Sequence, residues 1–316
     1  MSETLVREPQ AGVTPAIEIE APVVEEGFAY STGWIPDLPD IRDYTPDHPE
    51  IAPLLDAVGA GDPEKAVGTL PPLVDLRMWF SSVEDQDGTN SCTAHAGVGA
   101  IEFFERRAFG RYIDHSRLFL YKTTRDLLGW TADVGAFLRT TMGSMVLFGV
   151  PPERYWPFNV AKINDEPAAF HYSFAENYRA IKYYRLDPPG ITPPLLLNRI
   201  KTNLAAGLPA IFGFTVYSSI GQAKTNGGKI PYPRTGESVV GGHAVVAAGY
   251  DDAKVIKNMP LGPQTTGAIL IRNSWGTGWG QAGYGWLPYD YVLKGQATDF
   301  WSLIQNTWVD TGQFGL

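Results

Sequence analysis

Residues 84–97, EDQDGTNSCTAHAG, contain the only cysteine of the chain, Cys92. Ser91, directly before it, is a typical N-cap residue, and the following run, CTAHAGVGAIEFFERRA, has apolar residues at helical spacing and two arginines in its last turn. We therefore expect a loop that turns into a helix, with Cys92 in the first turn. A thiol in that position is a candidate nucleophile, because the helix dipole favours negative charge there.

The sequence pattern changes along the chain from one typical of helices to one typical of strands. Beyond the first helix, residues with helical spacing or helix-start signals predict helices near 51–66, 116–128, 133–149 and 193–206. From about residue 208 the chain contains short β-branched and aromatic runs punctuated by glycine, namely LPAIFGFTVY, GHAVVAAGYDD and GAILIRNSWG. A helical half followed by a β-rich half predicts an α+β fold.

Composition and charge exclude several classes of function. The formal net charge of −9 and the isoelectric point near 5.1 argue against nucleic acid or an anionic membrane as partner. No apolar run approaches the roughly 18 residues of a membrane span, and no secretory signal is visible. Five scattered histidines and one cysteine show no metal-ligand spacing, so neither a metal nor a cofactor is expected. We expect a cytoplasmic enzyme or binding protein.

Two polar residues of the β-rich half are candidates to work with the thiol. His243 follows two glycines and enters an apolar run, where an unpaired imidazole would be costly to bury. Asn273 follows an apolar strand and precedes two tryptophans, and its amide can orient an imidazole without opposing charge. Cys92, His243 and Asn273 are therefore the candidate catalytic set.

Taken together, these blocks resemble the papain-like cysteine peptidases over about residues 72–300. The order Cys, His, Asn is that of the family, and His243 lies 151 positions after Cys92, close to the roughly 130–150 expected. The block NSWGTGWG is nearly intact. The resemblance implies a papain-like two-lobe fold, with a helical lobe, a β-barrel-like lobe and the active-site cleft between them.

The resemblance also implies a role for each matching residue. Cys92 would attack the substrate carbonyl and form a thioester acyl-enzyme, with His243 as general acid and base. Asn273 would hold the imidazole, and Trp275 would screen that hydrogen bond and line the substrate site. Gln86 and the backbone N–H of Cys92 would form the oxyanion hole.

The chain departs from the family at several positions around the cleft. Thr89 replaces a disulfide cysteine, so the usual bridge is absent, and Thr93 replaces a tryptophan, as in some bacterial members that read Ser-Cys-Thr-Ala. Asn90 replaces a glycine of the cleft wall, where a side chain would narrow the non-primed side. Gly135, in TADVGAF, is the residue implied to pair with the substrate backbone. These departures predict an altered subsite preference.

The N-terminal region divides into parts of different kinds. Residues 1–26 are predicted to be a disordered tail, residues 27–71 a propeptide-like cover or a belt, and residues 72–316 the peptidase domain. Within that domain we expect the helical lobe at about 85–205 and the β-rich lobe at about 206–300. The stretch GWIPDLPDIRDY would either run through the cleft in reverse, as in a zymogen, or lie permanently on the fold. The regular carboxylates Asp37, Asp40 and Asp43 indicate a solvated face.

The sequence leaves three functions open. The first is a thiol peptidase that hydrolyses peptide or protein substrates and is covered by its own N-terminal segment. The second is a catalytically inactive peptide-binding module of the same fold. The third is a transpeptidase or ligase, because hydrolysis and aminolysis differ only in which nucleophile reaches the acyl-enzyme.

Overall fold

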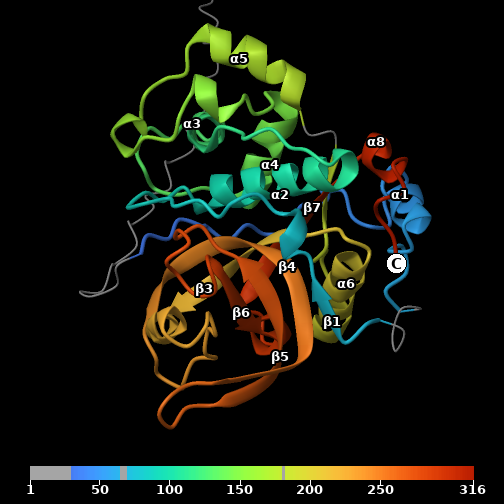
Figure 1. Ribbon diagram of the computed structural model, residues 1–316, viewed down its shortest axis with the longest axis vertical. Helices are drawn as coiled ribbons and strands as arrows, with labels where there is room; N and C mark the ends of the chain where they lie inside the picture. Colours follow the sequence, from blue (N-terminus) through green and yellow to red (C-terminus); the bar gives the residue numbers. More distant parts are fainter. Residues whose placement is uncertain (1–29, 65–69, 180–181) are drawn as a thin grey trace, which may run out of the picture.

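The structure is a computed structural model that describes residues 30–64, 70–179 and 182–316, arranged as a helical lobe above a β-rich lobe (Figure 1). The predicted tail, residues 1–26, lies outside the described residues. The helices are α1 (Ala52–Ala57), α2 (Cys92–Phe109), α3 (Arg117–Leu127), α4 (Leu138–Leu147), α5 (Ala169–Ala175), α6 (Pro193–Ala205), α7 (Tyr289–Leu293) and α8 (Asn306–Val309). The strands are β1 (Leu73–Asp75), β2 (Lys182–Arg185), β3 (Ala210–Tyr217), β4 (Val239–Lys257), β5 (Gln264–Arg272), β6 (Tyr284–Pro288) and β7 (Ala297–Ile304).

The β-rich lobe is built on one antiparallel sheet in the order β2-β7-β3-β4-β5-β6, with β1 paired to β4. The order begins at β2 and ends at β6, so the sheet is open, where the sequence predicted a barrel-like lobe. Its curvature comes from the long strand β4, whose register against β5 shifts between Ala247 and Gly249 and again after Asp251. Bulges of this kind bend a strand and increase its twist. The α+β class is confirmed.

Helix α2 is buried along its first thirteen residues, because it lies between the other helices of its lobe and strand β4. Small residues on α2 allow this close packing. A Cβ on Gly97 would stand 3.1 Å from the side chain of Leu120, and one on Gly99 would stand 2.4 Å from the guanidinium of Arg272. The predicted start of this helix at Cys92 is confirmed. Ser91 is the N-cap residue as predicted, but its hydroxyl contacts Thr89 and His95 and makes no side-chain capping bond to the helix.

The other predicted helices are present, with one informative difference in their bounds. Helix α4 begins at Leu138, five residues later than expected, because the chain before it is extended and bridges to Trp34 through Ala136. Proline at position 193 opens α6 as predicted, since its missing N–H is not needed in the first turn. No helix in the described part of the chain is long and apolar enough to cross a membrane.

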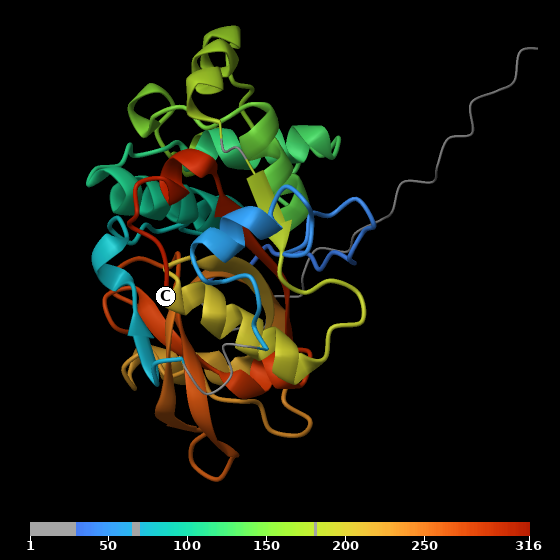
Figure 2. The same ribbon diagram turned by 90° about the vertical axis from the view of Figure 1, so that its right-hand side faces the viewer.

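The N-terminal region behaves as two pieces. The interlobe segment, residues 30–43, runs between the two lobes (Figure 1, blue). The anchor segment, residues 51–63, contains α1, which lies next to α8 in both views (Figures 1 and 2). Ile51 and Leu55 are fully buried, and the backbone N–H of Leu316 donates to the carbonyl of Val58. The anchor segment is therefore part of the hydrophobic core.

Replacing Leu55 by Ala should lower the free energy of unfolding by about 2–5 kcal/mol, because the side chain is fully buried and leaves a cavity. Chemical denaturation followed by tryptophan fluorescence measures the change. Leu38→Ala in the interlobe segment is the matched control, since that side chain is 83% exposed and its truncation should leave the stability unchanged. Equal stability of the two variants would show that the anchor segment does not belong to the core.

Candidate active site

The structure brings Cys92, His243 and Asn273 together from three separate elements. Cys92 opens α2, His243 lies on β4, and Asn273 directly follows β5. The backbone N–H of Ala244 contacts the Cys92 sulfur at 3.4 Å, which puts the thiol against the residue after His243. Nε2 of His243 and Oδ1 of Asn273 are 2.7 Å apart. All three side chains are almost completely buried.

The hydrogen bond to Asn273 decides which imidazole nitrogen can act on the thiol. Oδ1 of Asn273 also accepts the backbone N–H of Ser274 at 2.8 Å, so this atom is an acceptor and Nε2 of His243 carries the hydrogen. In the neutral ring, Nδ1 then holds the free electron pair. Nδ1 has no hydrogen-bond partner among the described residues. It is therefore the nitrogen that is free to exchange a proton with Cys92.

Trp275 covers the hydrogen-bonded pair of His243 and Asn273. Its ring stacks on the imidazole of His243 with centroids 4.4 Å apart and planes inclined by 23°. Trp279 packs edge-on against Trp275, with centroids 5.5 Å apart. The indoles exclude water from the bond between His243 and Asn273, which is stronger in such surroundings.

Burial keeps both catalytic candidates uncharged in this structure. It raises the pKa of the Cys92 thiol to about 12, and it lowers the pKa of His243 to about 4 against the raising effect of its bond to Asn273. Near neutral pH the site therefore holds a thiol and a neutral imidazole. Formation of a thiolate would require a more solvated or more polar site.

Gln86 lies beside the same site and is completely buried. Its Oε1 accepts the hydroxyl of Ser274 at 2.6 Å, which fixes the orientation of the amide. Its Nε2 donates to the carbonyl of Thr89 at 2.7 Å and to the carbonyl of Ser31 at 3.3 Å. Nε1 of Trp275 donates to that same Ser31 oxygen at 3.1 Å. A carbonyl oxygen of the interlobe segment thus occupies the Gln86 N–H, one of the two donors predicted for the substrate oxygen.

The interlobe segment also pairs with the backbone of both lobes. The N–H groups of Gly33 and Trp34 donate to the carbonyl of Gly242 at 2.9 and 3.0 Å. On the other side, the N–H of Ala136 donates to Gly33 at 2.9 Å and its carbonyl accepts from Ile35 at 3.1 Å, which makes a parallel bridge. The backbone groups that flank the candidate site are therefore already engaged.

The interlobe segment pairs with Ala136, the neighbour of Gly135, which is the residue predicted to pair with a substrate backbone. The N–H of Gly135 donates to the hydroxyl of Tyr121 at 3.0 Å, and the residue that pairs with an extended chain is its neighbour Ala136. Gly135 serves the approach of that chain in another way. It has a φ of +89°, and a Cβ there would stand 2.1 Å from the carbonyl oxygen of Gly33.

Asn90 points away from the position that the sequence predicted. Its side-chain amide donates to the carbonyl of Asp133 at 2.8 Å, and its backbone N–H donates to the Asp133 carboxylate at 3.0 Å. Thr89, at the position of the missing disulfide cysteine, bonds the carbonyl of Gln86 and the hydroxyl of Ser91. Hydrogen bonds thus hold the loop before Cys92, and Asn90 contacts the interlobe segment with its backbone, close to Gly33.

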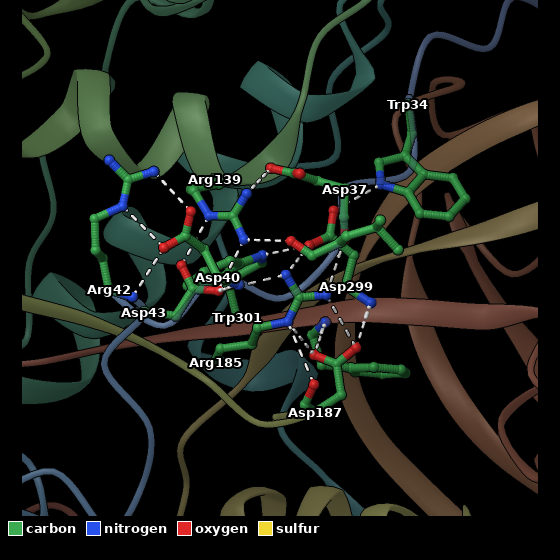
Figure 3. A network of polar contacts seen from close by, with 12 residues as sticks. Trp34, Asp37, Asp40, Arg42, Asp43, Arg139, Arg185, Asp187, Asp299 and Trp301 are labelled. Carbon is green, nitrogen blue, oxygen red and sulfur yellow. Dashed lines mark hydrogen bonds and ion pairs between the residues drawn. The ribbon is translucent and has the colours of Figure 1, made fainter. Parts of the chain in front are cut away.

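A network of charged residues holds the interlobe segment, and the sequence reasoning missed it (Figure 3). Arg139 of α4 pairs with Asp37 and, at 2.8 Å, with Asp43. The Asp43 side chain is only 6% exposed, so the prediction of a solvated face is wrong for this residue. Arg139 lies 96 positions from Asp43 and 102 from Asp37. The regular spacing of the aspartates was the only sign of this network in the sequence, and it does not indicate a partner as distant as Arg139.

The second half of this network is fully buried. Arg185 pairs with Asp187 at 3.1 Å and with Asp299 at 3.2 Å. The indole N–H of Trp34 donates to Asp299 at 3.0 Å (Figure 3), so the interlobe segment reaches the centre of the network. Burial raises the pKa of Asp299 to about 6, against the lowering effect of Arg185 and the two indoles.

Comparisons with known proteins agree with this geometry. Residues 70–299 match the papain family of cysteine proteases. An uncharacterised peptidase C1-like protein of Acanthamoeba polyphaga mimivirus is 33% identical over 243 residues, which cover 75% of this chain and 74% of the viral protein. The crystal structure of xylellain, a cysteine protease from Xylella fastidiosa, is 32% identical with a TM-score of 0.67, covering 87% of this chain and 96% of xylellain.

A more distant structure supports the fold alone. Procathepsin L 3 from the larval midgut of Tenebrio molitor has a TM-score of 0.56 at 20% identity, and the alignment covers 75% of this chain and 70% of the insect protein. The papain-like fold, the match over residues 70–299 and the relatives above 30% identity lead to one conclusion. This chain belongs to the papain family of cysteine proteases.

Proposed function

We propose that the protein hydrolyses peptide bonds through a Cys92 acyl-enzyme and that its own interlobe segment keeps it latent. The hydrogen bond between His243 and Asn273 carries the catalytic part of this proposal. It leaves Nδ1 of the imidazole as a free base beside a thiol at a helix start, which is the arrangement that nucleophilic catalysis requires.

In the proposed reaction, Nδ1 of His243 takes the proton of Cys92 and the sulfur attacks the substrate carbonyl carbon. The carbonyl oxygen becomes negative and is stabilised by the Gln86 amide N–H. His243 then gives its proton to the leaving nitrogen as the C–N bond breaks, which leaves a thioester on Cys92. Water, deprotonated by His243, attacks the thioester and releases the acid and the thiol.

Latency follows from what the interlobe segment occupies. The Ser31 carbonyl takes the Gln86 donor, and Gly33 to Ile35 take the backbone groups of Ala136 and Gly242. A substrate cannot pair there until residues 30–43 move. The anchor segment is core, so we expect only the interlobe segment to leave, by displacement or by cleavage in the exposed stretch around Leu38 and Ile41.

One experiment separates this proposal from the two other functions. The Trp34→Ala chain, which lacks the buried anchor of the interlobe segment, is incubated with a mixed peptide library, and both cleaved and ligated products are identified by mass spectrometry. Hydrolysis products alone support the peptidase, and ligated products support transfer to an amine. Peptide binding without either product supports an inactive binding module.

Replacing Trp34 by Ala in the full chain should release the latent state, because the indole is the buried anchor of the interlobe segment. We expect alkylation of Cys92 by iodoacetamide at pH 7 to become roughly 10-fold faster or more, since a solvated thiol regains a pKa near its ordinary value of about 8.5. In the unmodified chain, the rate should keep rising through pH 9, because the buried thiol has a pKa of about 12.

The matched control for this release is Leu38→Ala, which alters an exposed side chain of the same segment and should leave the rate unchanged. Labelling at one residue, lost in Cys92→Ala, identifies the reactive atom. If Trp34→Ala and Leu38→Ala alkylate at the rate of the unmodified chain, the interlobe segment does not make the enzyme latent.

Replacing His243 by Ala in the Trp34→Ala chain should reduce kcat/KM on a fluorogenic peptide by roughly 10⁴-fold or more, because the thiol loses its base. A thermal melt within a few degrees of the parent shows that the fold is retained. His171→Ala is the control, since that histidine bonds the Tyr155 carbonyl outside the site. Activity retained by the His243 variant would mean that another group is the base.

A further inference from the structure

The side chain of Trp34 fills a pocket in the β-rich lobe and is only 6% exposed. Two glycines make room for its ring. A Cβ on Gly213 of β3 would stand 1.9 Å from the indole, and a Cβ on Gly242 of β4 would stand 2.9 Å from it. Neither glycine has a positive φ, so the backbone does not require glycine at these positions. Their lack of a side chain instead leaves space for the indole. The pocket has the size and shape of a bicyclic aromatic side chain.

The floor of the pocket is the carboxylate of Asp299, whose two oxygens have different partners (Figure 3). Oδ1 accepts the indole N–H of Trp301 at 2.7 Å and pairs with Arg185 at 3.2 Å, both within the folded body. Oδ2 accepts the N–H of Trp34 at 3.0 Å. Asp299 is completely buried while Trp34 is in place, and departure of Trp34 removes the indole N–H that Oδ2 accepts. An unsatisfied buried acceptor is unfavourable.

The charges around Asp299 determine which donors suit it. Arg185 pairs both with this carboxylate and with Asp187, and it is itself buried. Among the described residues, Arg139 hydrogen-bonds only to Asp37, Leu38 and Asp43, so it loses these acceptors when the interlobe segment moves. Both guanidinium groups lie over the ring of Trp301, at 5.7 and 5.1 Å. Once the interlobe segment has moved, Arg139 and Arg185 therefore balance Asp187 and Asp299, and the region has no net charge that would attract a cationic side chain in preference to a neutral N–H donor.

We infer that this pocket selects the substrate and that Asp299 makes it prefer tryptophan, through one hydrogen bond from the indole N–H. The inference rests on the proposed peptidase function, because the interlobe segment then occupies the place of a substrate. Trp34 lies opposite Ala136 in its bridge. A substrate residue that pairs with Ala136 places its side chain in the same pocket.

Binding to an open, inactive form of the full chain tests the pocket without depending on turnover. The form carries Trp34→Ala to vacate the pocket and Cys92→Ala to prevent cleavage. The ligands are four blocked peptides that differ at one position, with tryptophan, 3-benzothienylalanine, leucine or arginine. Benzothienylalanine has the shape of tryptophan with sulfur in place of the N–H. Calorimetry gives the four dissociation constants.

We expect the tryptophan peptide to bind roughly 10-fold or more tightly than the benzothienylalanine peptide, since a hydrogen bond to a charged group has about that effect. Arginine and leucine should bind more weakly than tryptophan. Asp299→Asn should reduce the preference for the tryptophan peptide over the benzothienylalanine peptide to below about 3-fold. The amide keeps only one acceptor oxygen for two indole N–H groups, that of Trp301 and that of the peptide. Asparagine suits the positive φ of +63° at this position, so the backbone is preserved.

Three results would overturn the inference: equal binding of tryptophan and benzothienylalanine, tighter binding of arginine, or no saturable binding of any peptide at millimolar concentration. The comparison of peptides on unaltered Asp299 decides the matter even if Asp299→Asn does not fold. Restoring Cys92 tests the proposed function separately. Preference for tryptophan without cleavage would refute the peptidase and leave the pocket assignment standing.

Discussion

The contact between the start of α2 and strand β4 is the constraint on which the rest of the structure depends. It places the Cys92 sulfur 3.4 Å from the N–H of Ala244, and so brings a residue of the helical lobe against the strand that carries His243. Gly99 of the same helix leaves room for the guanidinium of Arg272 from the neighbouring strand β5. Without this packing the thiol and the imidazole would belong to two unrelated surfaces.

The same packing keeps the thiol of Cys92 and the imidazole of His243 uncharged while the interlobe segment is in place. Buried between α2, β4 and the interlobe segment, the thiol and the imidazole have pKa values of about 12 and about 4, which keeps both neutral. The Gln86 N–H that would stabilise a reacting oxygen is bound to the Ser31 carbonyl. The proposed latency therefore has two physical components, a segment that excludes substrate and a desolvated site that disfavours the thiolate.

The two pieces of the N-terminal region are held by different forces. The anchor segment buries Ile51 and Leu55 in the core, and such apolar burial is not screened by salt. The interlobe segment depends on Trp34 and on the ion pairs of Arg139 with Asp37 and with the nearly buried Asp43. The side chains of Arg139 and Asp37 are partly exposed, so salt screens the charges that hold this segment. This difference explains how one piece could move while the other stays folded.

The fold class, the helix that starts at Cys92 and the candidate set Cys92, His243 and Asn273 could be predicted from the sequence alone. These predictions depend on local spacing and on blocks of contiguous residues, so they need no knowledge of distant contacts. Gln86 and Trp275 were identified by the resemblance to the papain-like family, and the structure places Gln86 against Ser274, next to Asn273, and Trp275 against the imidazole of His243.

The contact partners of these residues became known only from the folded chain. The interlobe segment pairs with Ala136, while the N–H of Gly135 donates to the hydroxyl of Tyr121. The sheet is open, where a barrel-like lobe was expected, and the side chain of Asn90 bonds Asp133. The indole of Trp34 bonds Asp299, which lies 265 positions away. Such partners are set by the folding of the whole chain around one core, and local periodicity and spacing contain no information about them.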